Sequence, residues 1–81
     1  MTCSDALRKR ISDLCKKRNI TINHLAQMSG LPHTTVDAVA RGLTTNPRFQ
    51  TVYKIAIGLG MTISEFLNFP EMNEEMFDDI N

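Results

Sequence analysis

The amino-acid sequence predicts an all-α fold, a compact arrangement of five short helices around one core. Apolar residues recur three and four positions apart along most of the chain, which is the spacing of one helix face. Residues that cap or end helices stand between these apolar segments, and no stretch shows the alternation of a half-buried strand. With 81 residues, the chain has room for one small domain and no deep active-site cleft.

The first helix is predicted to begin behind Thr2 or Ser4, since either hydroxyl can cap it. Asn19 is its expected end. Its apolar face comprises Leu7, Ile11, Leu14 and Cys15.

Residues 22–41 predict a helix-turn-helix, formed by the second and third helices. Thr21 can cap the second helix, and Gly30 suits the left-handed residue that ends it. Leu31 is expected to anchor the turn, and Pro32 supplies a φ suited to a first helical turn. The third helix is expected to run from about Pro32 to Arg41, and Gly42 to end it. Small Ala26 allows the two helices to approach closely. Val36 and Val39 are expected to face the core.

The fourth helix is predicted to begin at Pro47 and to end at Gly60, with an apolar stripe of Val52, Ile55, Ala56 and Leu59. Phe49 and Tyr53 are expected in the core or at its edge. Thr62 and Glu65 predict a capping box ahead of a fifth helix, which carries Ile63, Phe66 and Leu67. We therefore expect a helix-turn-helix domain at residues 4–69, followed by residues 70–81 as an acidic C-terminal tail or a short extra helix.

Several classes of protein are excluded by composition. No run of 18 apolar residues predicts a membrane span, and the N-terminus lacks the apolar core of a signal peptide, so a cytoplasmic protein is expected. Cys3 and Cys15, with His24 and His33, match no common metal-ligand spacing, so no metal and no other cofactor is expected. Cys15 lies on the predicted buried face, where a thiol is poorly reactive, and no catalytic motif is present. An enzyme is therefore not expected.

The net charge is zero, but the charges are unevenly distributed. Residues 1–48 hold eight Lys and Arg against three Asp, a balance of +5, and residues 49–81 hold one Lys against six acids, a balance of −5. Nucleic-acid binding depends on the local field at the contact face. The basic half is therefore compatible with DNA, although its Lys16–Lys17–Arg18 run is equally readable as a solvated helix face.

The segment from Arg10 to Pro70 resembles the Xre/Cro-type helix-turn-helix regulators, whose DNA-binding domain has the lambda-repressor-like fold. The resemblance rests on the order of four pieces: RISDLCKKRNITI, HLAQMSG, TTVDAVARG and NPRFQTVYKIAIGLGMTISEFL. The segment from Arg10 to Pro70 covers about three-quarters of the chain, and the order of the four pieces within it is more specific than a helix-turn-helix pattern alone.

The resemblance implies roles for individual residues. Base reading falls to the exposed side of the third helix: His33, Thr34, Thr35, Asp37 and Ala38. Thr35 alternatively leans toward the backbone or the core, and Asp37 alternatively orients His33 or faces water. Phosphate contacts fall to the start of the second helix, the end of the third and the loop before the fourth: Thr21, Asn23, Arg41, Thr45, Asn46 and Arg48. Free N–H groups and the positive dipole end at a helix start favour such an anion. Arg41 alternatively serves only the dipole of its own helix.

Two positions depart from the family pattern. Ile22 stands where relatives often have Gln, and its apolar side chain cannot hydrogen-bond to phosphate. Cys15 and Ala40 stand where many relatives bury an Arg–Glu pair. Because both partners are replaced together, no buried charge is left unpaired, and such a replacement is often neutral or stabilising.

These observations predict a sequence-specific DNA-binding transcriptional regulator, a repressor that binds a palindromic operator as a homodimer. The alternative is a protein-interaction module of the same fold, of the antitoxin or anti-repressor type, that binds a protein partner through residues 71–81. That segment is a frayed acidic tail, a helix that packs on a second copy, or a segment that competes with DNA for the basic face.

Overall fold

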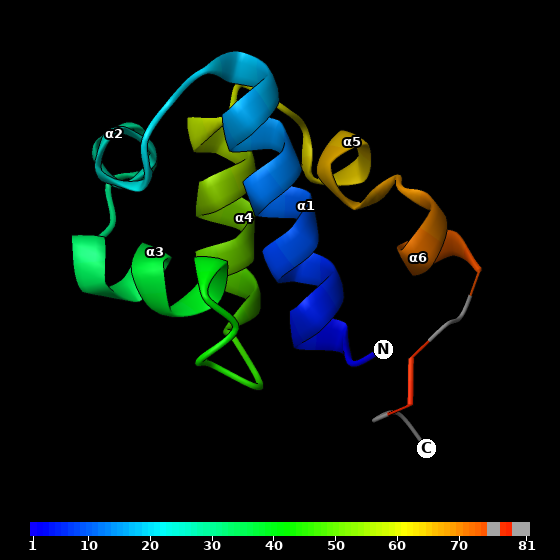
Figure 1. The fold of residues 1–81 in the computed structure, drawn as a ribbon. Coiled ribbons are helices and arrows are strands. Elements are labelled where there is room, and N and C mark those ends of the chain that lie inside the picture. The colour runs from blue at the N-terminus through cyan, green and yellow to red at the C-terminus, as the bar shows by residue number, and fades with distance from the viewer. Residues whose placement is uncertain (75–76, 79–81) are drawn as a thin grey trace.

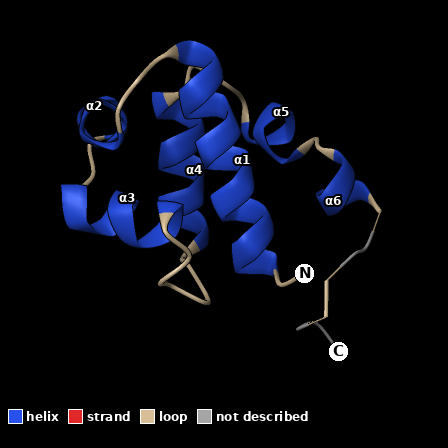
Figure 2. Ribbon diagram, viewed as in Figure 1, coloured by secondary structure: helices blue, strands red, loops and turns tan. Residues whose placement is uncertain are grey.

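The computed structural model describes residues 1–74, 77 and 78, which contain six helices and no strand (Figures 1 and 2). The helices are α1 (Cys3–Arg18), α2 (Ile22–Ser29), α3 (His33–Ala40), α4 (Phe49–Gly58), α5 (Ile63–Leu67) and α6 (Pro70–Asn73). The all-α prediction is confirmed. The sixth helix is a single turn within the segment that was expected to be a tail or a short extra helix.

The first five helices, α1 through α5, share one hydrophobic core. The largest fully buried side chains are Ile11, Leu25, Val36, Ile55 and Phe66, which come from five different helices. Helix α3 packs on α1 and α2, and α4 packs on α2 and α5. Figure 1 shows α2 and α3 on one side of α1 and α4, with α5 and α6 on the other.

Most helix ends are formed by capping residues that can be recognised in the sequence. The side chains of Thr2, Thr21 and Thr62 accept backbone hydrogen bonds at the starts of α1, α2 and α5. Thr2 and Thr62 belong to reciprocal capping boxes, and the backbone N–H of Thr62 lowers the pKa of Glu65. Asn19 and Gly30 adopt left-handed conformations after α1 and α2, with φ of 54° and 67°.

Two helix starts and one face of α4 differ from prediction. Pro32 and Arg48 are N-caps with extended backbone, so α3 begins at His33 and α4 at Phe49 rather than at Pro32 and Pro47. Phe49 and Tyr53 were predicted in the core or at its edge, and they are not in the core, since they are 67% and 44% exposed. Val52, Ile55 and Ala56 occupy the buried face of α4, and the two aromatic residues lie beside that face, toward solvent.

Helices α2 and α4 cross closely at two small residues, Ser29 and Gly58. A Cβ placed on Gly58 would lie 2.2 Å from Ser29 Oγ and 3.0 Å from the Ser29 backbone N and Cα. Ser29 is 8% exposed, and its hydroxyl has no hydrogen-bond partner among the described residues. Contact between the two helices therefore depends on the missing side chain of Gly58.

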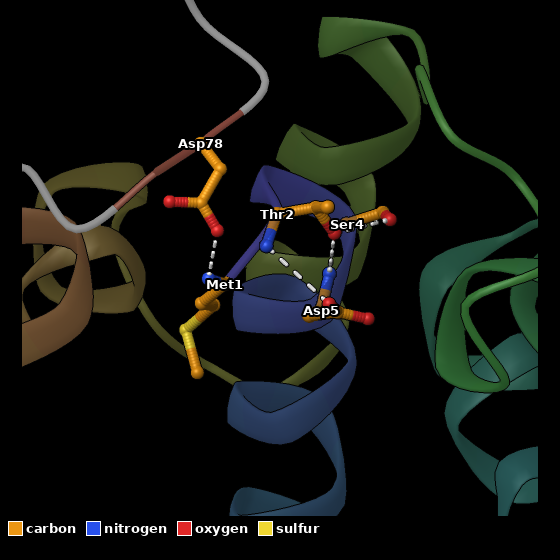
Figure 3. A network of polar contacts seen from close by, with 5 residues as sticks. All are labelled: Met1, Thr2, Ser4, Asp5 and Asp78. Atoms are coloured by element: carbon orange, nitrogen blue, oxygen red, sulfur yellow. Dashed lines mark hydrogen bonds and ion pairs between the residues drawn. The ribbon is translucent and has the colours of Figure 1, made fainter.

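The described part of the acidic segment folds back on α1. Glu71 Oε1 accepts from Lys9 Nζ at 2.8 Å, and Asp78 Oδ2 lies 2.5 Å from the terminal amino group of Met1 (Figure 3). Met72 packs against the core. The Met76 and Ile80 of the predicted apolar tail face lie outside the described residues.

Candidate nucleic-acid interface

The turn between α2 and α3 orients α3 so that one of its faces packs on the core and the opposite face is exposed to solvent. The N–H of Leu31 donates to the Ala26 carbonyl at 3.1 Å, which closes the end of α2 around Gly30. Val36 is fully buried and Val39 is 4% exposed. Their predicted core orientation is confirmed, and it fixes which face of α3 remains available.

The residues expected to read bases divide into two groups. His33 and Thr34, at the start of α3, are exposed, whereas Thr35, Asp37 and Ala38 are half-buried. A hollow of about 540 Å³ between α3 and the start of α4 brings together Thr34, Thr35 and Ala38 with Arg48, Gln50 and Thr51. The sequence interpretation overlooked Gln50 and Thr51. Their available signal was their place in the first turn of α4, off its apolar stripe.

Neither helix that borders this hollow has a side-chain N-cap. Pro32 lacks a polar side chain, and the Arg48 side chain makes no capping hydrogen bond. The first N–H groups of a helix have no carbonyl partner within it. Helices α1, α2 and α5 instead carry a Thr cap. The starts of α3 and α4 therefore leave backbone donors and a positive dipole end open beside one hollow.

Asp37 is paired with Arg41 rather than with His33. Arg41 Nη1 and Asp37 Oδ2 lie 3.4 Å apart, one helical turn from each other on α3, with the Arg41 side chain 67% exposed. Exposed pairs of this kind contribute about 0.3–0.5 kcal/mol, so either side chain can leave the pair for another partner. Arg41 thus remains available to an incoming anion.

The start of α2 lies in a second hollow, of about 470 Å³, between α1 and the end of α3. Thr21 Oγ1 accepts from the His24 N–H at 3.0 Å, so the hydroxyl expected to bind phosphate already serves as a cap. Lys16 and Arg41 line this hollow together with Thr21 and Ile22. Lys16 therefore joins the phosphate-binding candidates, and Asn23, which is exposed, completes the first turn of the helix.

Cys15 and Ala40 line the inner part of the same hollow. Cys15 is 7% exposed, and burial raises the pKa of its thiol. The space that an Arg–Glu pair occupies in many relatives is thus left to small apolar groups.

We expect Cys15 to react slowly with a thiol reagent in the folded protein, because burial limits access and the raised pKa lowers the thiolate fraction. The measurement is the labelling rate with an aromatic disulfide reagent in a Cys3→Ser variant, with and without urea. The folded protein should react at least about tenfold more slowly than the unfolded chain. Equal rates would place the thiol at the surface.

Much of the basic charge of α1 serves the fold. Arg10 donates from Nε to the Phe66 carbonyl and from Nη2 to the Glu65 carbonyl, each at 2.9 Å, and its guanidinium lies 5.2 Å from the centre of the Phe69 ring. Arg18 donates to the Leu59 carbonyl. Arg10 and Lys9, which is paired with Glu71, thus lie along the contact of α1 with α5 and α6, and Arg18 joins α1 to the end of α4. Lys16, Arg41 and Arg48 instead line the two hollows beside α3.

The loop before α4 presents the remaining predicted residues. Thr45, Asn46 and Arg48 are all exposed, and Arg48 lines the hollow beside α3, while Thr45 and Asn46 line a different one on the α1 side. Among the described residues, no helix is long and apolar enough to cross a membrane. No group of three or more His, Cys, Asp or Glu side chains is placed to hold a metal ion in this part of the chain.

Comparisons with known proteins find a matching domain family, two curated relatives and a solved structure of similar fold. The family described as the Cro/C1-type HTH DNA-binding domain matches residues 10–71. The HTH-type transcriptional regulator PuuR of Escherichia coli (strain K12) and that of Shigella flexneri are each 27% identical over 67 residues, 83% of this chain and 36% of theirs. The chain thus spans about a third of the length of these relatives. The crystal structure of the prophage Lp1 protein 11 superposes with a TM-score of 0.78 and 30% identity, covering 90% of this chain and 96% of that one.

Proposed function

Because the chain belongs to the family of Cro/C1-type helix-turn-helix DNA-binding domains, we propose that it is a sequence-specific transcriptional regulator, a repressor that inserts α3 into the major groove of a palindromic operator as a dimer. The observation that carries the proposal is the pair of uncapped helix starts, α3 and α4, which open beside one hollow together with Arg48. Such starts favour an anion, and a DNA phosphate is one.

The exposed start of α3 supplies the base contacts in this proposal. His33 donates to guanine N7 or O6, and Thr34 hydrogen-bonds to a base or contacts a thymine methyl group. Ala38 suits a thymine methyl group, half-buried Thr35 hydrogen-bonds to a base, and Asp37, once it leaves Arg41, accepts from a cytosine amino group. No Arg, Gln or Asn stands in this turn, so one copy discriminates modestly and two copies on a palindrome discriminate more.

Phosphate contacts flank α3 on both sides. On the α2 side they involve Lys16, Asn23 and Arg41, with the backbone N–H groups that follow the Thr21 cap. On the α4 side they involve Arg48 with the N–H groups of Gln50 and Thr51, which border the hollow beside α3. Thr45 and Asn46 are exposed in the loop before α4 but lie outside that hollow, and they are candidates for a further phosphate. The side chain of Ile22 contributes no hydrogen bond, but its N–H remains available at the helix start.

The test is selection from a randomised duplex pool, followed by salt titration on the best site. We expect an enriched palindrome, with log K falling by about 0.9 per log unit of salt for each phosphate contact. Arg48→Gln should weaken binding about tenfold on every sequence and reduce the salt slope by about 1, whereas His33→Ala should cost about 1–3 kcal/mol at one base position only.

Lys9→Gln is the charge-matched control, because Lys9 is paired with Glu71 away from α3. Its salt slope should equal that of the unmodified chain. If no sequence is enriched and binding disappears at physiological salt, α3 does not read DNA, and the protein-interaction module becomes the better interpretation.

A further inference from the structure

The outer side of α4 carries an apolar stripe that no other described part of the chain covers. Phe49, Tyr53 and Ile57 stand four residues apart and are 67%, 44% and 51% exposed. The two rings contact each other, with centroids 6.4 Å apart. We call these three residues the α4 stripe. Single exposed apolar residues are ordinary in a small domain, but three in register on one helix form a contiguous patch.

The α4 stripe continues into two hollows on its α5 side. One, of about 600 Å³, lies between α1, α4 and α5 and is the hollow that Thr45 and Asn46 also line; it joins Phe49 and Val52 to Leu67 and Met72. The other, of about 440 Å³, joins Tyr53 and Ile57 to Met61, Ile63 and Glu65. The surface offered to a partner is therefore a shallow apolar ridge with apolar hollows beside it.

The two edges of the α4 stripe carry opposite charges at the same level of the helix. Glu65 lies at the α5 edge, in the hollow beside Tyr53 and Ile57. Lys54 follows Tyr53 by about 100° around the helix, which places it at the opposite edge, toward the side where Gly58 meets α2. Lys54 has no ion-pair partner among the described residues.

We propose that the α4 stripe is the contact with a second copy of this chain, across a two-fold axis that runs along α4. A closed two-fold contact uses the same patch on both copies. With the axis along α4, each Lys54 faces the Glu65 edge of the other copy. An axis perpendicular to α4 would instead place like edges together, Lys54 with Lys54 and Glu65 with Glu65. Charge complementarity therefore selects the first arrangement and favours a second copy over an unrelated partner.

This arrangement gives the proposed homodimer a contact surface, and its biological meaning rests on the proposed function. With the two-fold axis along α4, both copies of α4 begin on the same side of the dimer. Arg48 and the start of α3, which border one hollow, are then presented on that side by both copies. A single duplex can contact both reading helices in this arrangement.

The exposed area of the three side chains is about 300 Å², well below the roughly 800 Å² per partner of a standard interface. The hollows add area, yet the free dimer should be weak. The test is analytical ultracentrifugation of the full chain without DNA, from about 10 µM to about 1 mM. The sedimentation coefficient of the unmodified chain should rise with concentration toward that of a dimer.

Ile57→Glu should remain monomeric throughout this range, because two buried carboxylates would meet near the axis. Met28→Glu is the matched control: Met28 is a 42%-exposed apolar residue on α2, off the α4 stripe, and this variant should dimerise like the unmodified chain. Both variants alter exposed positions, so circular dichroism should show unchanged helix content. A monomer at every concentration, or a dimer that Ile57→Glu leaves intact, would overturn the proposal.

The orientation is tested by a double-mutant cycle of Lys54→Gln and Glu65→Gln. Gln at position 65 keeps the capping box with Thr62 and removes only the charge. Each single variant should weaken dimerisation about threefold, and the double variant should be no weaker than either. Independent, additive effects would refute the arrangement with the axis along α4.

The failure of this proposal can be separated from the failure of DNA recognition. Ile57→Glu should bind a single half-site with unchanged affinity and lose the gain that a palindrome provides. Arg48→Gln should lose half-site affinity while its dimerisation in the absence of DNA stays intact. A palindrome bound equally well by Ile57→Glu and by the unmodified chain would refute the role of the α4 stripe on DNA.

Discussion

Gly58→Ala is expected to lower the free energy of unfolding by about 3 kcal/mol, although alanine is the better helix former. The added methyl group would meet Ser29 Oγ at 2.2 Å and the Ser29 backbone at 3.0 Å. A side chain can rotate away, but backbone atoms of α2 can move only if the two helices separate. The measurement is urea unfolding followed by circular dichroism. A change below about 0.5 kcal/mol would show that the crossing of α2 and α4 is not as tight as described.

Two further variants separate steric overlap from backbone conformation. Gly60→Ala, with nothing within 4 Å of the new Cβ but with φ of 71°, should cost only about 1 kcal/mol. Ser29→Ala removes a buried hydroxyl that has no partner among the described residues and should be close to neutral. Combined with Gly58→Ala, it should recover part of the lost stability, because it removes one of the overlapping atoms.

Arg10→Met should destabilise the fold by about 2 kcal/mol, through loss of two charge-assisted hydrogen bonds to the end of α5 and one stacking contact with Phe69. The carbonyls of Glu65 and Phe66 would lose their hydrogen-bond donor, and the Phe69 ring would lose the guanidinium stacked on it. Urea unfolding gives the value. Arg10→Lys should recover less than half of it, since an ammonium cannot bond to both carbonyls in one plane.

Lys17→Met is the control for loss of a positive charge from α1. Lys17 is exposed, so the free energy of unfolding of this variant should be within about 0.5 kcal/mol of that of the unmodified chain. If Arg10→Met and Lys17→Met lower the free energy of unfolding equally, the positive charge of α1, rather than the hydrogen bonds from Arg10 to α5, determines the stability.

The parts of the fold that could be predicted are those set by neighbouring residues. Thr21, Gly30 and Thr62 act within one turn of their own position, and their predicted roles as caps and helix ends are confirmed. Phe49 and Tyr53 were misplaced because periodicity identifies apolar residues without saying which apolar face a neighbour covers. Val52, Ile55 and Ala56 alone suffice to fill the contact of α4 with the core.

The candidate interface was less accessible from sequence, for a related reason. The charge balance of residues 1–48 treats all cations alike, yet Arg10 and Arg18 donate to carbonyls more than 40 positions away. Such partners cannot be found from spacing. Gln50 and Thr51 were overlooked because their position beside α3 depends on how α4 crosses the molecule, which no local motif encodes.

Because α3 and α4 begin without side-chain caps, the stability of the fold depends on whether an anion is bound at their first N–H groups. A suitable cap stabilises a helix by about 1 kcal/mol, and α3 and α4 forgo this contribution as long as only water meets their first N–H groups. An anion that accepts from those groups supplies the missing cap from outside the chain. Its binding energy then appears as added stability of the whole domain, growing with the logarithm of ligand concentration above the dissociation constant. The melting temperature is in this sense a property of the complex, and the free domain is the less stable member of a linked equilibrium.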